Sequence, residues 1–282
     1  MNEREPEPVI RRILVALDTS PHSMAALETA ARLAGLFGAE LLGIYVEDVN
    51  LLRASALPFA QETALRSGAR RRLDMDRIES ELRSQATLAR RALTDSADRA
   101  RVRWSFLLSR GTVVSELVMA ASEMDLVILG KSGWSPIERR RLGSTARALL
   151  SEAPGAALVL EHGSRLRPPL AVVCDGSALG RKALKLATTL SEREDSHLIL
   201  LALAEDLQEA RRIRDQCSQW LQGKGVLARY RIFNQWVASQ VAETLEQEGA
   251  GGLVVPATEA VLQEDELLTL LGTSDTPILL VR

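Results

Sequence analysis

The sequence predicts an α/β fold of two tandem domains, each with a five-stranded parallel sheet flanked by helices. Short runs rich in Val, Ile and Leu alternate with amphipathic segments, a pattern typical of parallel strands that are buried on both faces and connected by helices. The opening of the chain recurs in its second half, which indicates an internal duplication. The 282 residues are enough for two ordinary domains, each with its own core.

The elements of the first half follow from local patterns. Apolar runs predict strands over Arg12–Leu17, Glu40–Val46, Arg103–Leu108, Asp125–Leu129 and Ala156–Leu160. A first helix is expected after Ser20, because this hydroxyl residue is followed by a proline that suits the first helical position. A long surface helix is expected over Arg70–Ala100, where apolar residues recur every three or four positions and arginines occupy the other side.

The repeat defines the second half. Ile13–Ser20 aligns with Leu170–Ser177 at a constant offset of 157 residues. Later the offset falls to 127, where Leu126–Ile128 aligns with Leu253–Val255, and the missing residues correspond to the stretch around 49–72 and to a shorter second helix. Gly, Ser, Arg and two prolines within Gly163–Pro169 separate the two apolar patterns. We therefore predict domains at residues 1–163 and 168–282.

Composition and charge exclude several classes of protein. With 46% hydrophobic and 26% charged residues and a net charge of −2, the chain resembles soluble globular proteins and is not basic enough to have nucleic acid as its main partner. Cys174 and Cys217 are far apart in sequence and share no ligand spacing with the histidines, which disfavours a metal centre or disulfide framework. The polar N-terminus lacks the order of a signal peptide, and no apolar stretch is long enough to span a membrane. We expect a cytoplasmic protein without a membrane partner.

The most specific motif is a glycine-rich loop that leads from a strand into a helix. Gly130-Lys131-Ser132-Gly133 follows the fourth predicted strand, and after nine further residues Gly143-Ser144-Thr145 precedes an apolar helix. Such a loop gathers backbone amides and a helix N-terminus around one point, which suits phosphate oxygens. Two other glycine motifs do not fit, because a P-loop would need glycine at Asp125 and a dinucleotide fingerprint would need glycines at Asp18-Thr19-Ser20.

The spacing Gly-x2-Gly-x9-Gly-Ser/Thr resembles the ATP-binding type of the universal stress protein family, and Val15–Ser20, Ile44–Val46 and Ala153–Leu160 add to the resemblance. The duplication resembles the tandem form of that family. The resemblance implies Rossmann-like (HUP-type) domains and ATP as the ligand, with or without Mg²⁺. It also implies the cofactor-binding residues, which are Ala16, Leu17, Asp18, Val46, Gly130, Lys131, Ser132, Gly133, Gly143, Ser144 and Thr145.

The resemblance implies a role for each part of this set. Asp18 would lie near the ribose and adenine, and the backbone around Val46 would contact the adenine edge. Gly130 and Gly133 would wrap the phosphates, while Gly143, Ser144 and Thr145 would donate hydrogen bonds to them. Many relatives have a further hydroxyl residue where this chain has Ala146.

Structural alternatives stay open for these residues. The glycines could serve only to turn a strand into a helix, and an aspartate such as Asp18 at a strand end is often a cap or turn residue. The run Arg139-Arg140-Arg141 could contact phosphates or form a solvated loop face.

The second half has lost this loop. The glycine positions correspond there to Pro256-Ala257 and Ala260, and Gly272-Thr273 lies too close to the last strand to be followed by a phosphate-facing helix. We expect this half to bind no ATP, and to be either a structural part of the molecule or a binding surface for an unknown protein or a small apolar ligand. By family resemblance, the halves should form an intramolecular pseudo-dimer in which Ala156–Leu160 and Ile278–Val281 pair antiparallel.

The leading functional hypothesis is an ATP-binding universal stress protein with a regulatory or protective role in the stress response. The sequence offers no dedicated catalytic site, and slow ATP hydrolysis or self-phosphorylation on Ser144 or Thr145 is implied by the resemblance alone. The alternative is an interaction scaffold or small-ligand carrier, built from two such domains, that ignores nucleotide.

Overall fold

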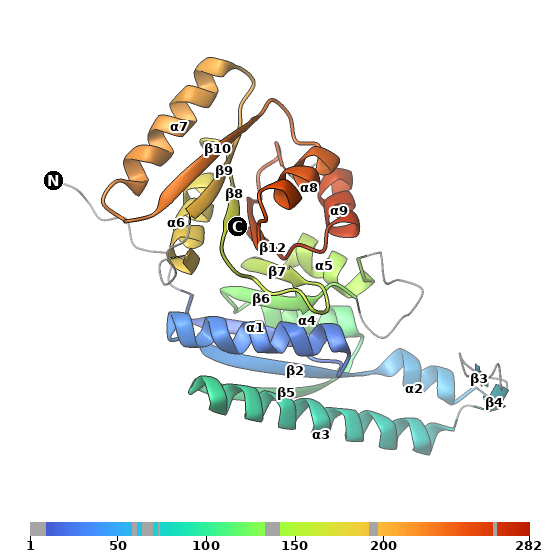
Figure 1. The fold of residues 1–282 in the computed structure, drawn as a ribbon. Helices are drawn as coiled ribbons and strands as arrows, with labels where there is room; N and C mark the ends of the chain where they lie inside the picture. Colours follow the sequence, from blue (N-terminus) through green and yellow to red (C-terminus); the bar gives the residue numbers. More distant parts are fainter. Residues whose placement is uncertain are drawn as a thin grey trace.

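The computed structural model describes residues 10–57, 61–63, 70–72, 74–132, 142–191, 197–261 and 264–282. Strands and helices alternate along both halves of the chain (Figure 1). The first half contains β1 (Arg12–Ala16), α1 (Pro21–Phe37), β2 (Glu40–Asp48), α2 (Val49–Ser55), β3 (Gln61–Thr63), β4 (Arg70–Arg72), α3 (Met75–Ala100), β5 (Trp104–Gly111), α4 (Val113–Ala121), β6 (Leu126–Gly130), α5 (Ser144–Glu152) and β7 (Ala156–Leu160).

The second half repeats this order without the elements that correspond to α2, β3 and β4. It contains β8 (Leu170–Cys174), α6 (Ala178–Ser191), β9 (His197–Leu203), α7 (Leu207–Leu221), β10 (Leu227–Phe233), α8 (Ala238–Gln247), β11 (Gly252–Pro256), α9 (Glu264–Thr273) and β12 (Ile278–Val281). The expectation that the additional residues of the first half lie around 49–72 and in a longer second helix is therefore confirmed, because α3 has 26 residues and α7 has 15.

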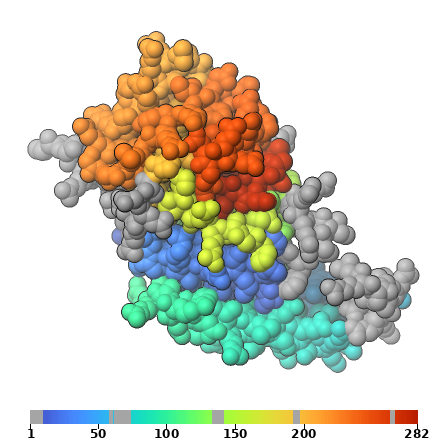
Figure 2. All heavy atoms as spheres, viewed as in Figure 1, coloured from blue at the N-terminus to red at the C-terminus, as the bar shows by residue number. Residues whose placement is uncertain are grey.

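Ten of the described strands form one sheet, in the order β10-β9-β8-β11-β12-β7-β6-β1-β2-β5. Within each half the five strands are parallel and have the same order, with the first strand of the half at the centre. The halves meet where β12 pairs antiparallel with β7, with Leu279 opposite Leu158. This pairing confirms the antiparallel contact that the family resemblance implied. In Figure 2 the atoms of the two halves meet along a continuous surface.

Helices cover both faces of the sheet, and each face has a buried apolar cluster. The cluster on one face includes Ile13, Ile128 and Val254, and the other includes Leu14, Val127 and Leu253. Strand residues alternate between the two clusters, as the pleat of a strand requires. The strands are therefore buried on both sides, which explains why they appear in the sequence as unbroken apolar runs.

The structure corrects the expected start of the long helix. The long helix begins at Met75 rather than Arg70, because the Asp74 side chain caps the amide of Asp76 and Arg70–Arg72 pairs instead with Gln61–Thr63. The predicted strands otherwise differ from the observed ones by a few residues at their ends.

The alignment of the fourth strands is also corrected, from an offset of 127 to one of 126. Ile13 pairs with Leu126 in the first half, and its equivalent Leu170 pairs with Gly252 in the second. A one-residue slip in a strand moves every side chain to the opposite face. With the observed offset, Val127 and Leu253 occupy the same cluster, as equivalent residues should.

A cation from each half reaches the C-terminus of the last helix of the other half. The Lys131 ammonium donates to the carbonyl of Ser274, at the end of α9, over 3.2 Å. The Arg282 guanidinium donates to the carbonyl of Ala153, at the end of α5, over 2.6 Å, and to that of Leu150. Cations are stabilised at helix C-termini by the helix dipole and the unpaired carbonyls. The two contacts are reciprocal and join the halves, although the cations follow strands that are not equivalent, β6 and β12.

Among the described residues, none of the helices combines the length and the apolar character that crossing a bilayer requires.

Candidate functional site

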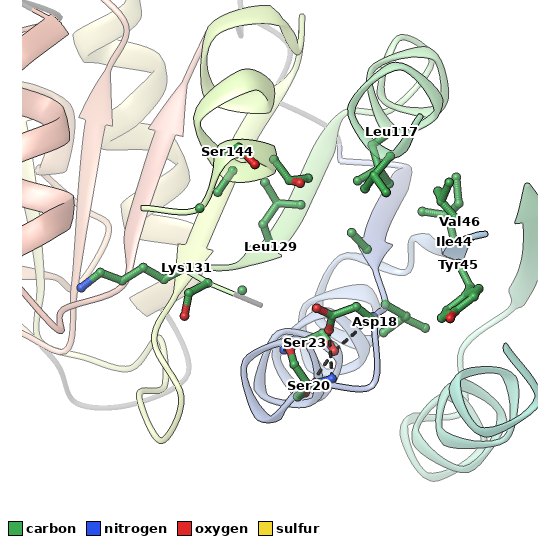
Figure 3. Close-up of a pocket in the computed structure, with 18 residues that line it drawn as sticks. Asp18, Ser20, Ser23, Ile44, Tyr45, Val46, Leu117, Leu129, Lys131 and Ser144 are labelled. Carbon is green, nitrogen blue, oxygen red and sulfur yellow. Dashed lines mark hydrogen bonds between the residues drawn. The ribbon is translucent and has the colours of Figure 1, made fainter. Parts of the chain in front are cut away.

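A pocket of about 310 Å³ lies at the carboxyl ends of the central strands of the first half (Figure 3). It opens where β1 has β2 on one side and β6 on the other, so the chain leaves these strands in different directions. Such switch points are where open α/β sheets place their ligands, because the loops diverge and leave a crevice. The volume suits a small-molecule ligand.

The pocket gathers the candidate residues of the sequence analysis that the structure describes. They are Ala16, Leu17, Asp18, Val46, Gly130, Lys131, Ser132, Gly143, Ser144 and Thr145. Gly133 and the run Arg139–Arg141 lie outside the described residues. The ligand-binding roles of all these residues remain predictions.

One wall of the pocket is polar and comes from the turn between β1 and α1. The Ser20 side chain caps α1 by accepting from the amide of Ser23 over 3.2 Å, and the Asp18 carboxylate accepts from the amide of Ser20 over 2.9 Å. Asp18 therefore has a turn-forming role, which is the structural alternative that the sequence analysis left open for it. Its side chain is also half-buried and lines the pocket, so the carboxylate is held in a fixed position there.

A second wall is apolar and comes from β2 and α4. Ile44 and Val46 at the end of β2 lie near Leu117 of α4 in Figure 3, and Val113 completes this wall. Tyr45 is buried, and its hydroxyl donates to Gln85 over 2.9 Å. Burial, with the negative charges of Glu47 and Asp18, raises the pKa of Tyr45 to about 12.

Sequence reasoning did not assign some of these lining residues to the site. Val113 and Leu117 are one helical turn apart at the start of α4, which follows β5, and this apolar pair at a strand-to-helix junction is the signal that could have identified them. Ser23 also lines the pocket, and its place three residues after the helix cap Ser20 is the signal that could have identified it.

The third side of the pocket is the N-terminus of α5. Gly143 is the N-cap residue in extended backbone conformation, and Ser144, Thr145 and Ala146 follow along the pocket. The first amides of a helix have no acceptor within the helix, and the helix dipole adds partial positive charge at this end. This side of the pocket therefore favours an anion.

The two described glycines of the loop differ in what a side chain would meet. A Cβ at Gly130 would lie 2.7 Å from the Cβ of His22 and 2.9 Å from its carbonyl carbon, so glycine is required there by packing against the start of α1. A Cβ at Gly143 would meet its nearest neighbour at 3.5 Å, which is an ordinary contact. Packing within the fold therefore explains why residue 130 is glycine, but it does not explain why residue 143 is glycine.

The side chains of Lys131 and Ser132 leave the pocket, although both residues line it. The Lys131 ammonium is buried beside Glu161 at 3.2 Å and reaches Ser274 of the second half, while Figure 3 shows its side chain pointing away from Asp18. The Ser132 hydroxyl lies 3.2 Å from Nε2 of His22. Because Nδ1 of His22 accepts from the amide of His162, its Nε2 carries the proton and donates to Ser132.

The sequence comparisons identify the family. The model of the universal stress protein family matches residues 10–161, more than half of the chain. The chain belongs to the universal stress protein family. Membership indicates a role in the stress response, and the matched range includes every residue that lines the pocket. No curated protein is similar enough in sequence to be counted as a relative.

Solved structures extend the likeness of this universal stress protein to its whole length. A universal stress protein from Archaeoglobus fulgidus DSM 4304 is 15% identical, with a TM-score of 0.73, over 98% of this chain and 97% of that chain. A functionally unknown protein from Pseudomonas aeruginosa PAO1 is also 15% identical, with a TM-score of 0.59, over 97% and 93% of the two chains. At this identity the likeness establishes the fold, an α/β arrangement of two Rossmann-like halves.

The second half of this universal stress protein has different groups near the equivalent strand ends. Asp175 is equivalent to Asp18, and its carboxylate accepts from the hydroxyl of Thr258 over 2.7 Å. Trp236, which precedes α8, is buried in the same apolar cluster as Leu201 and Val255 at the strand ends. The sequence analysis offered this region to an unknown protein or a small apolar ligand, and that role remains a prediction.

The described residues of the second half also differ from the pocket in the features that favour an anion. Pro256 ends β11 where Gly130 ends β6, and proline has no amide to donate. The helix α9 begins with Glu264-Asp265-Glu266 in place of Gly143-Ser144-Thr145, and the Glu266 carboxylate accepts from the amide of Ala238 over 2.5 Å. Gly272-Thr273 lies at the end of α9, so no helix begins there.

Within the described part of the chain, no three His, Cys, Asp or Glu side chains gather as a metal site would require.

Proposed function

We propose that this universal stress protein binds ATP in the pocket of its first half, one molecule per chain, and acts in the cytoplasm as a nucleotide-dependent regulatory or protective protein. The observation that carries the proposal is Gly143, where a Cβ would meet only ordinary contacts while the residue caps the helix that points at the pocket. A ligand that approaches this backbone closely would explain why residue 143 is glycine, because a side chain would hold the ligand away.

The three walls of the pocket correspond to the three parts of a nucleotide. Ile44, Val46 and Leu117 provide an apolar slot that suits a purine base. The Asp18 carboxylate can accept from ribose hydroxyls, and the N-terminus of α5 can stabilise phosphates. Asp18 and Ser144 lie on opposite sides of the pocket in Figure 3, so the fixed negative charge is separated from the anion-favouring end.

Mg²⁺ enters this proposal with the nucleotide. Proteins usually hold Mg²⁺ through substrate phosphates and water rather than through an all-protein cage, so the described residues need supply few ligands.

Calorimetric titration of the full chain with ATP tests the proposal. We expect one ATP per chain, because in the second half Asp175 is hydrogen-bonded to Thr258 and α9 begins with acidic residues. Two ATP molecules per chain would contradict this account of the second half. Absence of binding would contradict the proposal and favour the alternative, a scaffold or small-ligand carrier that ignores nucleotide.

The variant Gly143→Val tests the site directly. Its side chain would occupy the space beside the phosphates, and we expect an affinity loss of about tenfold or more, or at least about 1.4 kcal/mol. The extended backbone of Gly143 accepts valine, so the fold should lose only about 1 kcal/mol from the weaker helix cap. Gly35→Ala, in α1 away from the pocket, is the control and should bind ATP like the parent. Equal affinity of Gly143→Val and the parent would show that the glycine only shapes a turn.

A further inference from the structure

A buried histidine behind the pocket joins three segments of the first half. His22 lies in the first turn of α1, and its side chain is 11% exposed. It is not among the described residues that line the pocket. Its ring bonds to Ser132, beyond the end of β6, and to His162, beyond the end of β7. Segments that are far apart in the sequence therefore meet at this ring.

The two ring nitrogens of His22 have different partners. Nδ1 accepts from the amide of His162 over 3.0 Å, so it carries no proton. Nε2 therefore carries the proton and donates to the hydroxyl of Ser132, 3.2 Å away. In this tautomer His22 cannot accept the proton of Ser132, so the pair is an anchor and not a nucleophile with its base.

The surroundings of His22 hold its ring in place. Its backbone packs against Gly130, where a Cβ would lie 2.7 Å from the Cβ of His22. The rings of His22 and His162 meet edge to face, with their centroids 5.9 Å apart. The Glu161 carboxylate lies 3.7 Å from Nδ1 and is paired with the Lys131 ammonium at 3.2 Å. The Nε2 proton is therefore a donor in a fixed position.

The serine that His22 holds lies where the two ends of the glycine-rich loop meet. The carbonyl of Lys131 accepts from the amide of Gly143, the N-cap of α5, over 2.9 Å. A Cβ on Gly143 would lie 3.5 Å from this carbonyl oxygen and 3.7 Å from the Cα of Ser132. A shift of Ser132 would therefore move the N-terminus of α5, which is the side of the pocket that favours an anion.

We propose that His22 is a positioning residue of the nucleotide site. Through its hydrogen bond to Ser132, it holds the start of the loop against α1 and keeps the N-terminus of α5 in the place that phosphates require. This inference rests on the proposed ATP binding and adds to it a residue that does not touch the ligand. Donors that are already in position bind an anion more tightly, because less ordering of the backbone is needed when the ligand arrives.

Calorimetric titration of the full chain with ATP tests His22 through two matched variants. His22→Gln keeps an N–H donor near the position of Nε2, whereas His22→Asn keeps an acceptor near the position of Nδ1 and has no donor that reaches Ser132. We expect the ATP affinity to fall about fivefold to tenfold in His22→Asn, as for the loss of one hydrogen bond, and to be largely recovered in His22→Gln. The control is His162→Ala, which keeps the amide that His22 uses and should bind ATP like the parent.

A double-mutant cycle separates positioning from a general loss of stability. Ser132→Ala should lower the ATP affinity by a similar factor, and His22→Asn/Ser132→Ala should lower it little further, because both changes remove the same bond. Urea unfolding gives the stability of each variant. Affinities that follow stability and not the presence of the donor would overturn the proposal.

The remaining outcomes distinguish this inference from the proposed function. Equal affinity of His22→Asn and the parent would overturn the role of His22 and leave ATP binding intact, whereas absence of binding by the parent would overturn both. Amide hydrogen exchange of the ligand-free chain tests the anchor by itself. The amide of Gly143 should exchange faster in His22→Asn than in His22→Gln, and equal rates would show that the histidine does not hold the loop.

Discussion

Gly130 and Gly35 differ in the space that a side chain would find, so alanine at the two positions should have opposite effects on stability. Gly130→Ala would place a Cβ 2.7 Å from the Cβ of His22 and 2.9 Å from its backbone, so we expect a loss of about 1–3 kcal/mol in the free energy of unfolding. Gly35→Ala has room in the interior of α1 and should stabilise the protein by about 0.5–1 kcal/mol. Urea unfolding measures both changes. Equal stability of Gly130→Ala and the parent would mean that α1 can move away at no cost.

Tyr45 predicts a specific alkaline loss of stability. Its pKa is raised from 10.0 to about 12 by burial and by the charges of Glu47 and Asp18. In the unfolded chain the phenol ionises near pH 10, while the folded protein keeps its proton until about pH 12. The contribution is therefore complete below pH 10 and is lost as the pH rises toward 12.

The variant Tyr45→Phe tests this pH dependence. Its unfolding free energy should fall less steeply than that of the parent between pH 10 and about pH 12. At neutral pH it should be about 1 kcal/mol less stable, because the hydrogen bond to Gln85 is lost. Urea unfolding at a series of pH values gives both quantities, and an unchanged alkaline slope would assign that loss to other groups.

The sequence predicted which residues lie at the pocket better than it predicted where their side chains point. The strand-end positions of Asp18 and Val46 follow from the apolar runs before them, and the helix after Gly143 follows from its spacing. The direction of Lys131 could not be predicted in the same way. Its partner Ser274 lies 143 residues away in the other half, and no local pattern records such a contact.

At the scale of elements, the Lys131 contact with the end of α9 is open to direct test. Lys131→Met would leave the Glu161 carboxylate, which is 18% exposed, without its cation and would remove the charge at the helix end. We expect a loss of about 3 kcal/mol in the free energy of unfolding. The double variant Lys131→Met/Glu161→Gln should recover part of this loss, because it removes the uncompensated charge.

A surface ion pair provides the matched control for this measurement. Arg165 and Glu28 are 79% and 63% exposed and 3.8 Å apart. Arg165→Met should change the stability by no more than about 0.5 kcal/mol, since exposed pairs contribute little. A similar loss for both variants would show that the effect is not specific to the buried contact.

Sequence periodicity predicts elements well where one face is polar and poorly where both faces are buried. The strands β6 and β11 are apolar on both faces, so no alternation of polar and apolar residues fixes their register. The sequence alignment of these strands was therefore wrong by one residue. The start of α3 was misplaced for a related reason. Arg70–Arg72 continues the helical spacing of charged residues, and only the cap at Asp74 ends it.

For the whole molecule, the continuous sheet predicts a compact particle in solution. The antiparallel pairing of β7 with β12 leaves the halves no independent tumbling. Small-angle scattering should give a radius of gyration of about 19 Å, the value for a compact chain of this length. A two-bead profile with a clearly larger radius would contradict the arrangement.

The likeness of the two halves could be predicted from the duplication, because a repeated sequence implies a repeated fold. The division at residues 163 and 168 remains a prediction. The burial of Trp236 and the hydrogen bond between Asp175 and Thr258 could not be predicted, since they depend on how distant loops meet. These differences from the first half are part of the physical basis for expecting a single nucleotide site.

The reciprocal contacts of Lys131 and Arg282 make the two halves one cooperative unit. Each half stabilises the end of a helix that belongs to the other, so unfolding of either half leaves a helix C-terminus of its neighbour without its cation and a sheet edge without its partner. If the two halves unfold together, a ligand that binds the first half stabilises the second half as well. A half that binds no nucleotide would still melt at the temperature set by the nucleotide, which gives a domain without a site a reason to be retained.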